Sequence, residues 1–330
     1  MRVARIAWSL SLILLCSSLL SGCLTLPPPK GPSHAVNTPP AAAFPNCLAD
    51  TSTRFSFRKR VVFTRLDVQN RKNIDGLYGI QSRYVDTLSA RLDRNKYQSL
   101  ALSSIGLNDI EAVDLHGKSM QLQQKISNIS RQYQAQFVVG GEILDMGQQY
   151  PRDRFSRLFR DYPVLKDYSQ DPERLIEIRL DIYNGSTGVL LDQETFSAWS
   201  RDGADLNQSY TLMGRRFMRS AIGMALDGLI EQQSDYVSGL LSCIPLQAEV
   251  LRIASGEQGV LSVGAQQGLR PGDEFKVYRN SEPSGVHDQK VSQRSIGKIK
   301  ISEVYPDFAF GSLDDESGAS LRQGDWIRAW

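Results

Sequence analysis

The chain has 330 residues, with 38 lysines and arginines against 36 aspartates and glutamates. This nearly equal number of basic and acidic residues argues against a nucleic-acid-binding protein, which needs a basic surface. An apolar content of 41% is ordinary for a globular protein, and the length is sufficient for two domains.

The first 22 residues have the features of a secretory signal. Arg2 and Arg5 precede an apolar run over 6–20 that is too short for a stable membrane span. The motif "LSGC" then resembles the bacterial lipobox, and it ends at Cys23. We therefore expect residues 1–22 to be cleaved and Cys23 to be acylated. The alternative is a plain secreted protein in which Cys23 is an ordinary thiol.

Two or three acyl chains on Cys23 would anchor the protein durably, since each buried methylene contributes about 0.8 kcal/mol. The next residue is Leu24, whereas in the lipoproteins that this segment resembles an aspartate there signals retention in the inner membrane. The resemblance implies a protein in the periplasm, anchored to the inner leaflet of the outer membrane. Without Arg2 and Arg5 the mature chain has 36 basic and 36 acidic residues.

Residues 23–46 form a proline-rich linker. Seven of the fourteen prolines lie between 24 and 46, and no apolar periodicity is present. Such a composition favours extended polyproline II conformation. The folded part is therefore expected to be tethered to the membrane and not embedded in it.

The four cysteines are Cys16, Cys23, Cys47 and Cys243. Cys16 is lost with the signal and Cys23 is acylated, which leaves Cys47 and Cys243 in an oxidising compartment. We predict a disulfide between them, closing a loop of roughly 200 residues and contributing about 4–5 kcal/mol in the chain-entropy model. Two buried free thiols are the alternative.

The segment 47–243 is predicted to be a layered α/β domain, because strand and helix patterns alternate along it. Asn184–Gly185 marks the turn of its clearest hairpin, and Gly140–Gly141 indicates a bulge or a close backbone approach. The expected elements are strands at 59–68, 96–104 and 135–146, helices at 76–94, 118–134 and 208–233, and a hairpin at 173–200.

Two basic segments lie in this domain. In "RFSFRKRVVFTR" (54–65), aromatic and basic residues are interleaved; we expect an edge strand there, and the alternative is a polyanion site. The second segment, within 147–173, has aromatic residues at helical spacing flanked by arginines. We favour aromatics that close the domain's own core. The functional alternative is a partner-binding surface made of Arg154, Phe155, Arg157, Phe159 and Arg160.

The segment 244–330 is predicted to be a small β-barrel of five or six strands. It contains an internal echo, "LRPGDEFKVY" (269–278) and "LRQGDWIRAW" (321–330). A tight Gly-Asp turn feeding a strand explains both copies, with Asp273 and Asp325 capping the turns. Ligand binding by these two aspartates is the alternative, and a calcium site at "LDDES" (313–317) is a weaker one.

The sequence contains no arrangement of residues that indicates catalysis. Its three histidines are His34, His116 and His287, and HExxH, CxxC, GxSxG, Walker A and GxGxxG motifs are absent. We predict no catalytic residue, no metal site and no cofactor. The chain is interpreted as a binding or scaffold protein.

Three stretches carry a family resemblance: "KRVVFTRLDV" (59–68), "LSCIPLQAEVLRI" (241–253) and "GAQQGLRPGDEFKVYRN" followed by "IGKIKISEV" (264–304). They resemble the middle and C-terminal domains of flagellar assembly protein T. The resemblance implies a TolB-N-like α/β domain followed by a small SH3-like β-barrel. It also implies a place in the periplasmic H-ring around the flagellar basal body of polar, sodium-driven motors.

The partners implied by the resemblance are flagellar basal-body ring proteins, other flagellar outer-membrane lipoproteins and further copies of the chain in a ring. No nucleic acid is expected. The sequence departs from the family pattern at two points. Only a linker separates Cys23 from Cys47, where the family has a separate N-terminal domain, and a lipobox replaces a non-lipidated signal.

The sequence is compatible with three functions. The first is a non-enzymatic structural component of the flagellar basal body, anchored in the outer membrane. The second is an outer-membrane lipoprotein that activates a peptidoglycan synthase, which the barrel domain disfavours. The third is a periplasmic enzyme, which would need converging acids or a histidine in a pocket.

Overall fold

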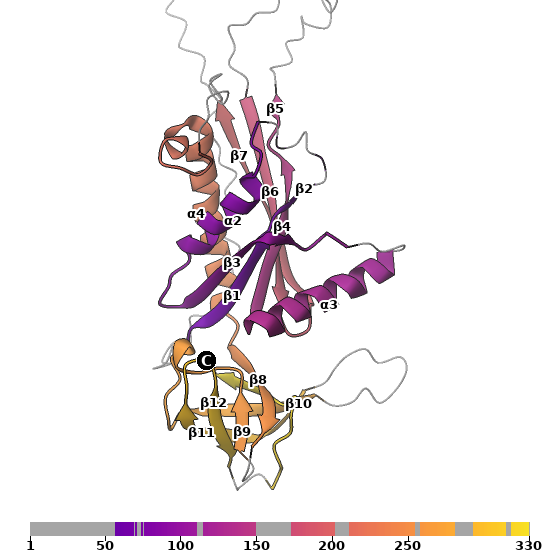
Figure 1. The fold of residues 1–330 in the computed structure, drawn as a ribbon, viewed down its shortest axis with the longest axis vertical. Helices are drawn as coiled ribbons and strands as arrows, with labels where there is room; N and C mark the ends of the chain where they lie inside the picture. Colours follow the sequence, from indigo (N-terminus) through magenta and orange to yellow (C-terminus); the bar gives the residue numbers. More distant parts are fainter. Residues whose placement is uncertain are drawn as a thin grey trace, which may run out of the picture. The chain divides into compact units, whose positions relative to one another are not determined.

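The computed structural model describes residues 57–68, 70, 74, 76–110, 115–149, 173–201, 211–254, 258–280, 293–314 and 318–329. These residues form an open β-sheet with helices on both faces, followed by a closed β-barrel (Figure 1). The predicted layered α/β domain and C-terminal barrel are both confirmed.

The sheet has seven strands in the order β3-β1-β4-β6-β5, with β2 beside β4 and β7 beside β6. Strands β1 to β4 run parallel, and β5, β6 and β7 pair antiparallel. The strands are β1 (Lys59–Arg65), β2 (Asp67–Val68), β3 (Tyr97–Gly106), β4 (Phe137–Asp145), β5 (Gln148–Gln149), β6 (Glu173–Asn184) and β7 (Leu190–Arg201).

Strand β1 lies inside the sheet, between β3 and β4, so the expectation of an edge strand at the basic cluster is wrong. Val61, Val62 and Phe63 are at most 1% exposed. Strands of parallel sheets are covered on both faces, which explains a continuous apolar run in place of alternation. The basic residues before this run therefore have another role, described below.

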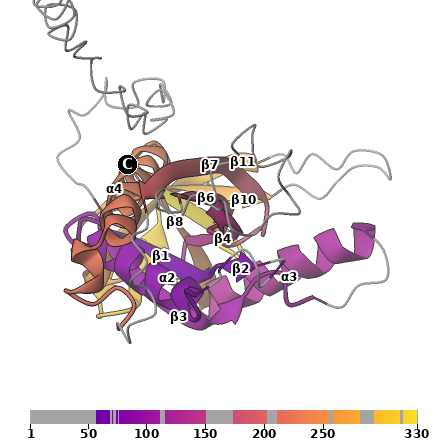
Figure 2. The ribbon, with the colours of Figure 1, turned by 90° about the horizontal axis from the view of Figure 1, so that it is seen from above.

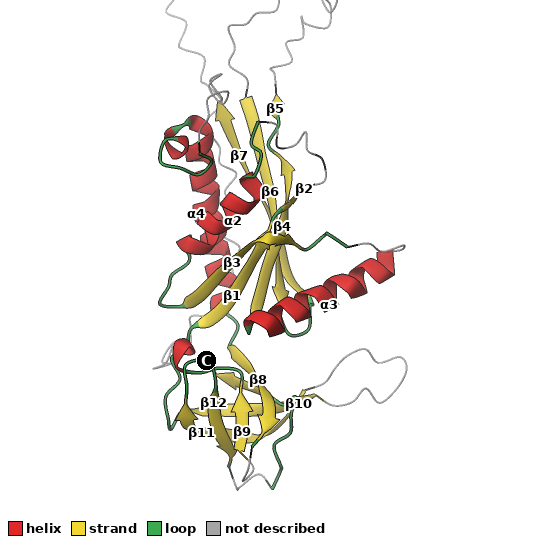
Figure 3. Cartoon of the chain, in the orientation of Figure 1, coloured by secondary structure: helices red, strands yellow, loops and turns green. Residues whose placement is uncertain are grey.

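Helices α2 (Ile80–Arg91) and α4 (Ala221–Ser242) cover one face of the sheet (Figure 3). Tyr84 of α2 and Leu226 of α4 belong to the same buried cluster as Phe63 and Ile178 of the strands. The hydroxyl of Tyr84 donates to Gln233 Oε1 at 2.9 Å, which ties the two helices together.

Helix α4 begins later and ends later than the predicted helix at 208–233. The turn η4 (Phe217–Arg219) precedes it, and the Ser220 hydroxyl accepts the Gly223 N–H at 3.2 Å as an N-cap. Met213 has a positive φ of 60°, which an α-helix does not permit. Capping and this backbone turn, which apolar spacing does not reveal, set the start of the helix.

Helix α3 (Leu115–Tyr133) covers part of the other face of the sheet, where Ile126 and Ile129 pack with Val62, Val138 and Tyr183. No described helix is long and apolar enough to cross a membrane.

The pair Gly140–Gly141 allows a close approach of neighbours. A Cβ on Gly140 would meet the Leu107 side chain, and one on Gly141 would meet the Arg179 carbonyl oxygen of β6. The register between β4 and β6 is regular at both glycines. Of the two alternatives, the structure has the close approach and not the bulge.

The barrel closes in the order β10-β11-β12-β9-β8-β13. Its core contains Val250, Leu261, Phe275, Ile299 and Ile327. The strands are β8 (Leu246–Ile253), β9 (Gln258–Leu261), β10 (Glu274–Asn280), β11 (Gln293–Val304), β12 (Ala309–Leu313) and β13 (Trp326–Ala329).

The sequence echo gives two equivalent turns, as predicted. The carboxylate of Asp273 accepts the Arg270 N–H, and that of Asp325 accepts the Arg322 N–H, each at 2.8 Å. The strands that follow, β10 and β13, pair with each other. Asp325 differs from Asp273 in being 2% exposed and in holding Arg279 through two hydrogen bonds of 2.7 and 2.8 Å.

Candidate functional site

The first candidate site is the junction between the sheet and the barrel, where β1 and β3 begin. The Arg58 N–H donates to the Gln267 carbonyl oxygen of the barrel at 2.9 Å. Gln267 ends the single turn η6 (Ala265–Gln267). One residue earlier, the Phe57 ring lies 5.3 Å from that of Phe275 and packs against the barrel core. The chain entering β1 is therefore part of the barrel's packing.

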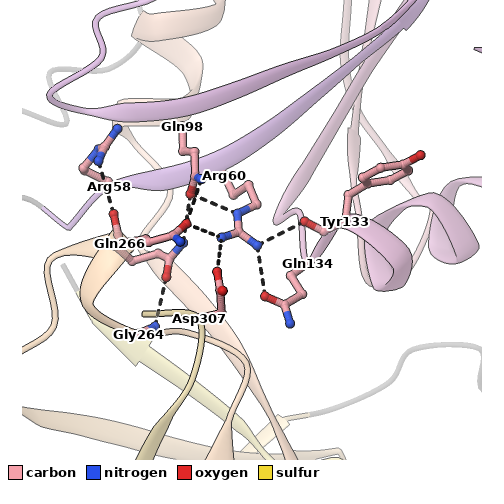
Figure 4. Close-up of polar contacts among 9 residues, drawn as sticks. Arg58, Arg60, Gln98, Tyr133, Gln134, Gly264, Gln266 and Asp307 are labelled. Carbon is pink, nitrogen blue, oxygen red and sulfur yellow. Dashed lines mark hydrogen bonds and ion pairs between the residues drawn. The ribbon is translucent and has the colours of Figure 1, made fainter. Parts of the chain in front are cut away.

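Arg60 is the centre of this junction (Figure 4). Its side chain is 12% exposed, and its five N–H groups match five acceptors. A guanidinium with every donor satisfied is held in one position, because each hydrogen bond constrains the same planar group. The acceptors are Gln98 Oε1 at 3.0 Å, the Tyr133 carbonyl at 3.2 Å, Gln134 Oε1 at 2.9 Å, Gln266 Oε1 at 3.1 Å and Asp307 Oδ1 at 3.2 Å.

Three glutamines extend the network across the junction. The Gln98 amide donates to Gln266 Oε1 at 2.9 Å, and the Gln267 amide donates to Gln98 Oε1 at 3.2 Å. Gln267 is 3% exposed, and its own oxygen accepts the Gly264 N–H at 2.9 Å. Gln98 and Gln267 thus each use both their donor and their acceptor, as a buried amide requires, and Gln266 Oε1 accepts two hydrogen bonds.

A second connection lies where α4 leads into β8. Gln136 donates to the Pro245 carbonyl at 2.7 Å and accepts the Gln247 N–H at 3.2 Å. The Lys59 ammonium donates to the Leu241 carbonyl at 2.6 Å. Both ends of the α/β domain's chain are therefore fastened at the barrel.

Burial lowers the pKa of Lys59 from 10.5 to about 8. Desolvation disfavours the ammonium, whereas the carbonyl at the C-terminus of α4 favours it. Burial is therefore the cause of the lower pKa, and the charge of Lys59 changes in the alkaline range near pH 8.

The second candidate site is a cleft of about 320 Å³ beyond the carboxyl ends of β1 and β3. Its charged groups are mostly paired: Arg65 bonds Asp109 at 2.9 Å, and the Asp67 carboxylate accepts the Asn108 N–H at 2.9 Å. Burial, then the nearby Asp109, raises the pKa of Asp67. The cleft is lined by Arg65, Leu66, Asp67, Val68, Gln81, Asn108, Asp109, Lys118 and Glu142.

A row of polar side chains leads from the cleft across the sheet. Glu142 of β4 accepts Arg179 of β6 at 2.9 Å, and Arg179 also bonds Asp181 at 3.2 Å. Asp181 in turn accepts the Gln193 amide of β7 at 2.6 Å. These cross-strand pairs stabilise the antiparallel half of the sheet.

The cleft lining has no histidine, cysteine or hydroxyl nucleophile. Among the described residues no group of three His, Cys, Asp or Glu side chains could hold a metal ion. The polar groups of the lining offer hydrogen bonding and charge pairing.

The predicted site residues are placed only in part. Cys243 caps the C-terminus of α4, half-buried, with its sulfur 3.5 Å from the Gly239 carbonyl oxygen. Cys23, Cys47, Arg154, Phe155, Arg157, Phe159 and Arg160 lie outside the described residues. The lipid anchor, the disulfide and the partner surface therefore stay predictions.

The sequence does not predict this junction: the basic residues of the segment 54–65 predict an edge strand there. The barrel partners of Arg60 are Gln266 in the turn η6 and Asp307 in a loop, both far along the chain. An arginine at the entry of a strand buried on both faces was the available signal, since its charge needs partners outside the sheet.

The open sheet covered by helices and the closed six-stranded barrel that follows it define a protein with a layered α/β part and a C-terminal β-barrel. Two family models match this chain: flagellar assembly protein T, middle domain, over residues 51–210, and flagellar assembly protein T, C-terminal domain, over residues 256–328. The chain belongs to the flagellar assembly protein T family.

Among curated proteins, no sequence matches the chain. Solved structures similar to it include the hypothetical protein CT253 from Chlamydia trachomatis, with 16% identity and a TM-score of 0.37, over 55% of this chain and 96% of that one. The PelC dodecamer from Paraburkholderia phytofirmans has 12% identity and a TM-score of 0.31, over 55% and 89%. TolB from Acinetobacter baumannii has 10% identity and a TM-score of 0.26, over 77% and 57%.

Proposed function

We propose that the protein is a non-enzymatic structural component of the flagellar basal body. The observation that carries this proposal is the match of both folded parts to flagellar assembly protein T. The role is that of an H-ring-like element in the periplasm, in contact with basal-body ring proteins and flagellar outer-membrane lipoproteins.

The junction supports a structural role. A component that transmits position between partners needs fixed geometry, and Arg60 with its five acceptors joins sheet and barrel without a free donor. The paired charges at the cleft are compatible with the same role, because they fix the loops that follow β1 and β3 to one another.

The proposal includes attachment to the inner leaflet of the outer membrane through acylated Cys23. Residues 1–22 would be the cleaved signal and 23–46 the linker, with folded domains at 47–243 and 244–330. The motif "LSGC" behind an apolar run supports this. Labelled palmitate should enter the wild-type protein and not Cys23→Ala; equal labelling of both would refute the anchor.

A Cys47–Cys243 disulfide completes the proposal. The position of Cys243 at the end of α4 supports it, because a bridge there would fasten the helix at the junction. Titration of the denatured, unreduced protein should find neither of these two thiols free. Two reactive thiols would refute the bridge.

The decisive experiment is a clean deletion in the native bacterium, complemented with the wild type and with Cys23→Ala. We expect loss of swimming and of periplasmic ring density around the basal body by electron cryotomography, restored by the wild type. Normal motility and intact rings in the deletion would reject the function. Capture of a peptidoglycan synthase in place of flagellar proteins would favour the synthase-activator alternative.

A further inference from the structure

The open sheet has two long edge strands, β3 at one end and β7 at the other (Figure 2). Within the described part of the chain, β3 pairs with β1 alone and β7 with β6 alone. An edge strand presents unpaired backbone groups, and natural proteins usually protect such edges.

Strand β3 lacks two of the usual forms of edge protection, charged residues and proline. Its ten residues, "YQSLALSSIG", include no charged side chain and no proline. Its pairing with β1 is regular from Tyr97 to Leu102, with a shift only at the far end. An uncharged edge that is regularly paired over six residues is a template for a further strand.

The register identifies the outward backbone groups of β3. Lys59 donates to the Lys96 carbonyl, so even-numbered residues of β3 turn toward β1 and odd-numbered ones turn away. Ser99 and Ala101 therefore point their N–H and C=O groups outward. Of the next outward residue, Ser103, the carbonyl accepts the Ser82 hydroxyl at 2.7 Å.

The same reasoning applies to β7. Asn184 of β6 donates to the Val189 carbonyl, so even-numbered residues of β6 turn toward β7. A register shift at Ile182/Tyr183 inserts one extra residue in β7, and Ile182 pairs with Asp192 beyond it. From Asp192 onward, even-numbered residues of β7 therefore turn toward β6 and odd-numbered ones turn away. Gln193 lies on this outward series, whereas Phe196 belongs to the inward one.

The directions of β3 and β7, and the faces on which their side chains lie, are compatible with parallel pairing of the two edges. Strand β7 runs antiparallel to β6, which runs antiparallel to β4, so β7 is parallel to β3. Ala101, an outward residue of β3, packs toward the α2 and α4 layer, and so does the inward residue Phe196 of β7. In a parallel pair an outward residue sits opposite an inward one, so the helix layers of two copies fall on the same side.

Exposed apolar side chains of both edges lie on the opposite face. Leu100 of β3 is 40% exposed and pairs with Val62, whose side chain is under α3. On β7, Leu190 is 45% and Trp199 47% exposed, and Leu190 pairs with Tyr183, which is also under α3. Pairing of β3 with β7 would bring the Leu100 face of one edge beside the Leu190 and Trp199 face of the other and remove apolar surface from water.

We propose that copies of this chain assemble head to tail, with β3 of one copy paired in parallel with β7 of the next, so that the sheet continues from copy to copy. Such a contact uses two different surfaces and generates a ring or a filament. The inference rests on the proposed function in one respect: the strand pairing is the contact through which a structural component would assemble. The pairing itself is tested on purified protein, so its failure is distinguishable from failure of the flagellar role.

The test uses the purified full-length chain in mild detergent, followed by sedimentation velocity over a wide range of concentrations. Leu100→Lys places a charge on the β3 edge, and Trp199→Lys places one on the β7 edge. Met224→Lys is the matched control, because Met224 is a 61% exposed apolar residue that lies on α4 and in neither edge strand. Thermal unfolding of each variant verifies that it is folded.

We expect the wild type and Met224→Lys to form concentration-dependent oligomers, and each edge variant alone to stay monomeric. A mixture of Leu100→Lys with Trp199→Lys should stop at a dimer, since each variant keeps the edge that the other has lost. A monomeric wild type at all concentrations would overturn the proposal. Dimers of Trp199→Lys alone would also overturn it, because they indicate β3 pairing with its own copy.

Discussion

Arg60 of β1 donates to Gln266 Oε1 of the barrel at 3.1 Å, and this oxygen also accepts the Gln98 amide at 2.9 Å. One glutamine oxygen thus joins two strands of the sheet to the barrel. The glutamine acceptor is uncharged. The strength of the Arg60–Gln266 hydrogen bond therefore depends on the exclusion of water and on the fixed plane of the guanidinium.

Replacement of Arg60 tests this arrangement. Arg60→Lys keeps the charge but offers three donors in place of five, so glutamine and carbonyl acceptors lose partners in a half-buried site. We expect the free energy of unfolding to fall by about 1–3 kcal/mol. Urea denaturation measures it. Arg252→Lys, at an exposed position of β8, is the control and should leave the midpoint unchanged.

Lys59 predicts a pH dependence. Its pKa is about 8 in the folded protein and 10.5 without the fold, so the unfolded chain binds more protons between these values. The stability attributable to this group therefore rises as pH increases from about 8 to 10.5, by at most about 3 kcal/mol, and is lost as pH falls through 8. Urea midpoints of the wild type and Lys59→Met, compared across this range, measure the difference.

The corresponding control is Lys96→Met, since Lys96 is exposed. Its difference from the wild type should stay flat with pH. An equally flat difference for Lys59→Met would show that the ammonium remains charged at the end of α4 throughout.

The two echo turns should respond unequally to loss of their aspartates. Asp273→Ala removes one backbone cap and should cost about 1 kcal/mol. Asp325→Ala also leaves Arg279 without its two hydrogen bonds and should cost about 2–3 kcal/mol. Thermal unfolding of both variants decides it, and equal losses would mean that the Arg279 pair adds nothing.

Gly141 predicts a steric effect. A Cβ there would meet the Arg179 carbonyl, which is backbone of the neighbouring strand and cannot turn aside. Gly141→Ala should therefore destabilise the protein by about 1–3 kcal/mol. The matched change Gly228→Ala lies in α4 with nothing within 4 Å, and should stabilise by about 0.5–1 kcal/mol. Urea midpoints that move in the same direction would contradict this.

Regular elements were predictable where side chains report their surroundings. In β6 the alternation of Ile176, Ile178 and Leu180 with polar residues gave the strand and its buried face. For α4 the same kind of pattern gave the wrong bounds, because apolar spacing continues through a segment in which Met213 turns the backbone and Ser220 caps the helix. Local backbone geometry decided the boundary there.

The junction could not be predicted for a different reason. Gln98 and Gln266 are more than 160 residues apart, and an amide shows neither charge nor periodicity in a sequence. Arg60 did stand out, but a basic residue before a strand is compatible with an edge, a polyanion site or a junction. Only the position of β1 between β3 and β4 separates these alternatives.

The double attachment of the barrel has a mechanical consequence. The covalent connection runs from α4 into β8, and the Arg60 network lies at the opposite end of the α/β domain's chain, with the Lys59–Leu241 bond between them. With a single connection the barrel could rotate relative to the sheet, whereas two separated connections resist such a rotation. Force applied to the barrel would reach the sheet at the starts of β1 and β3 together. It would act as shear on many hydrogen bonds and not as tension on a single hydrogen bond.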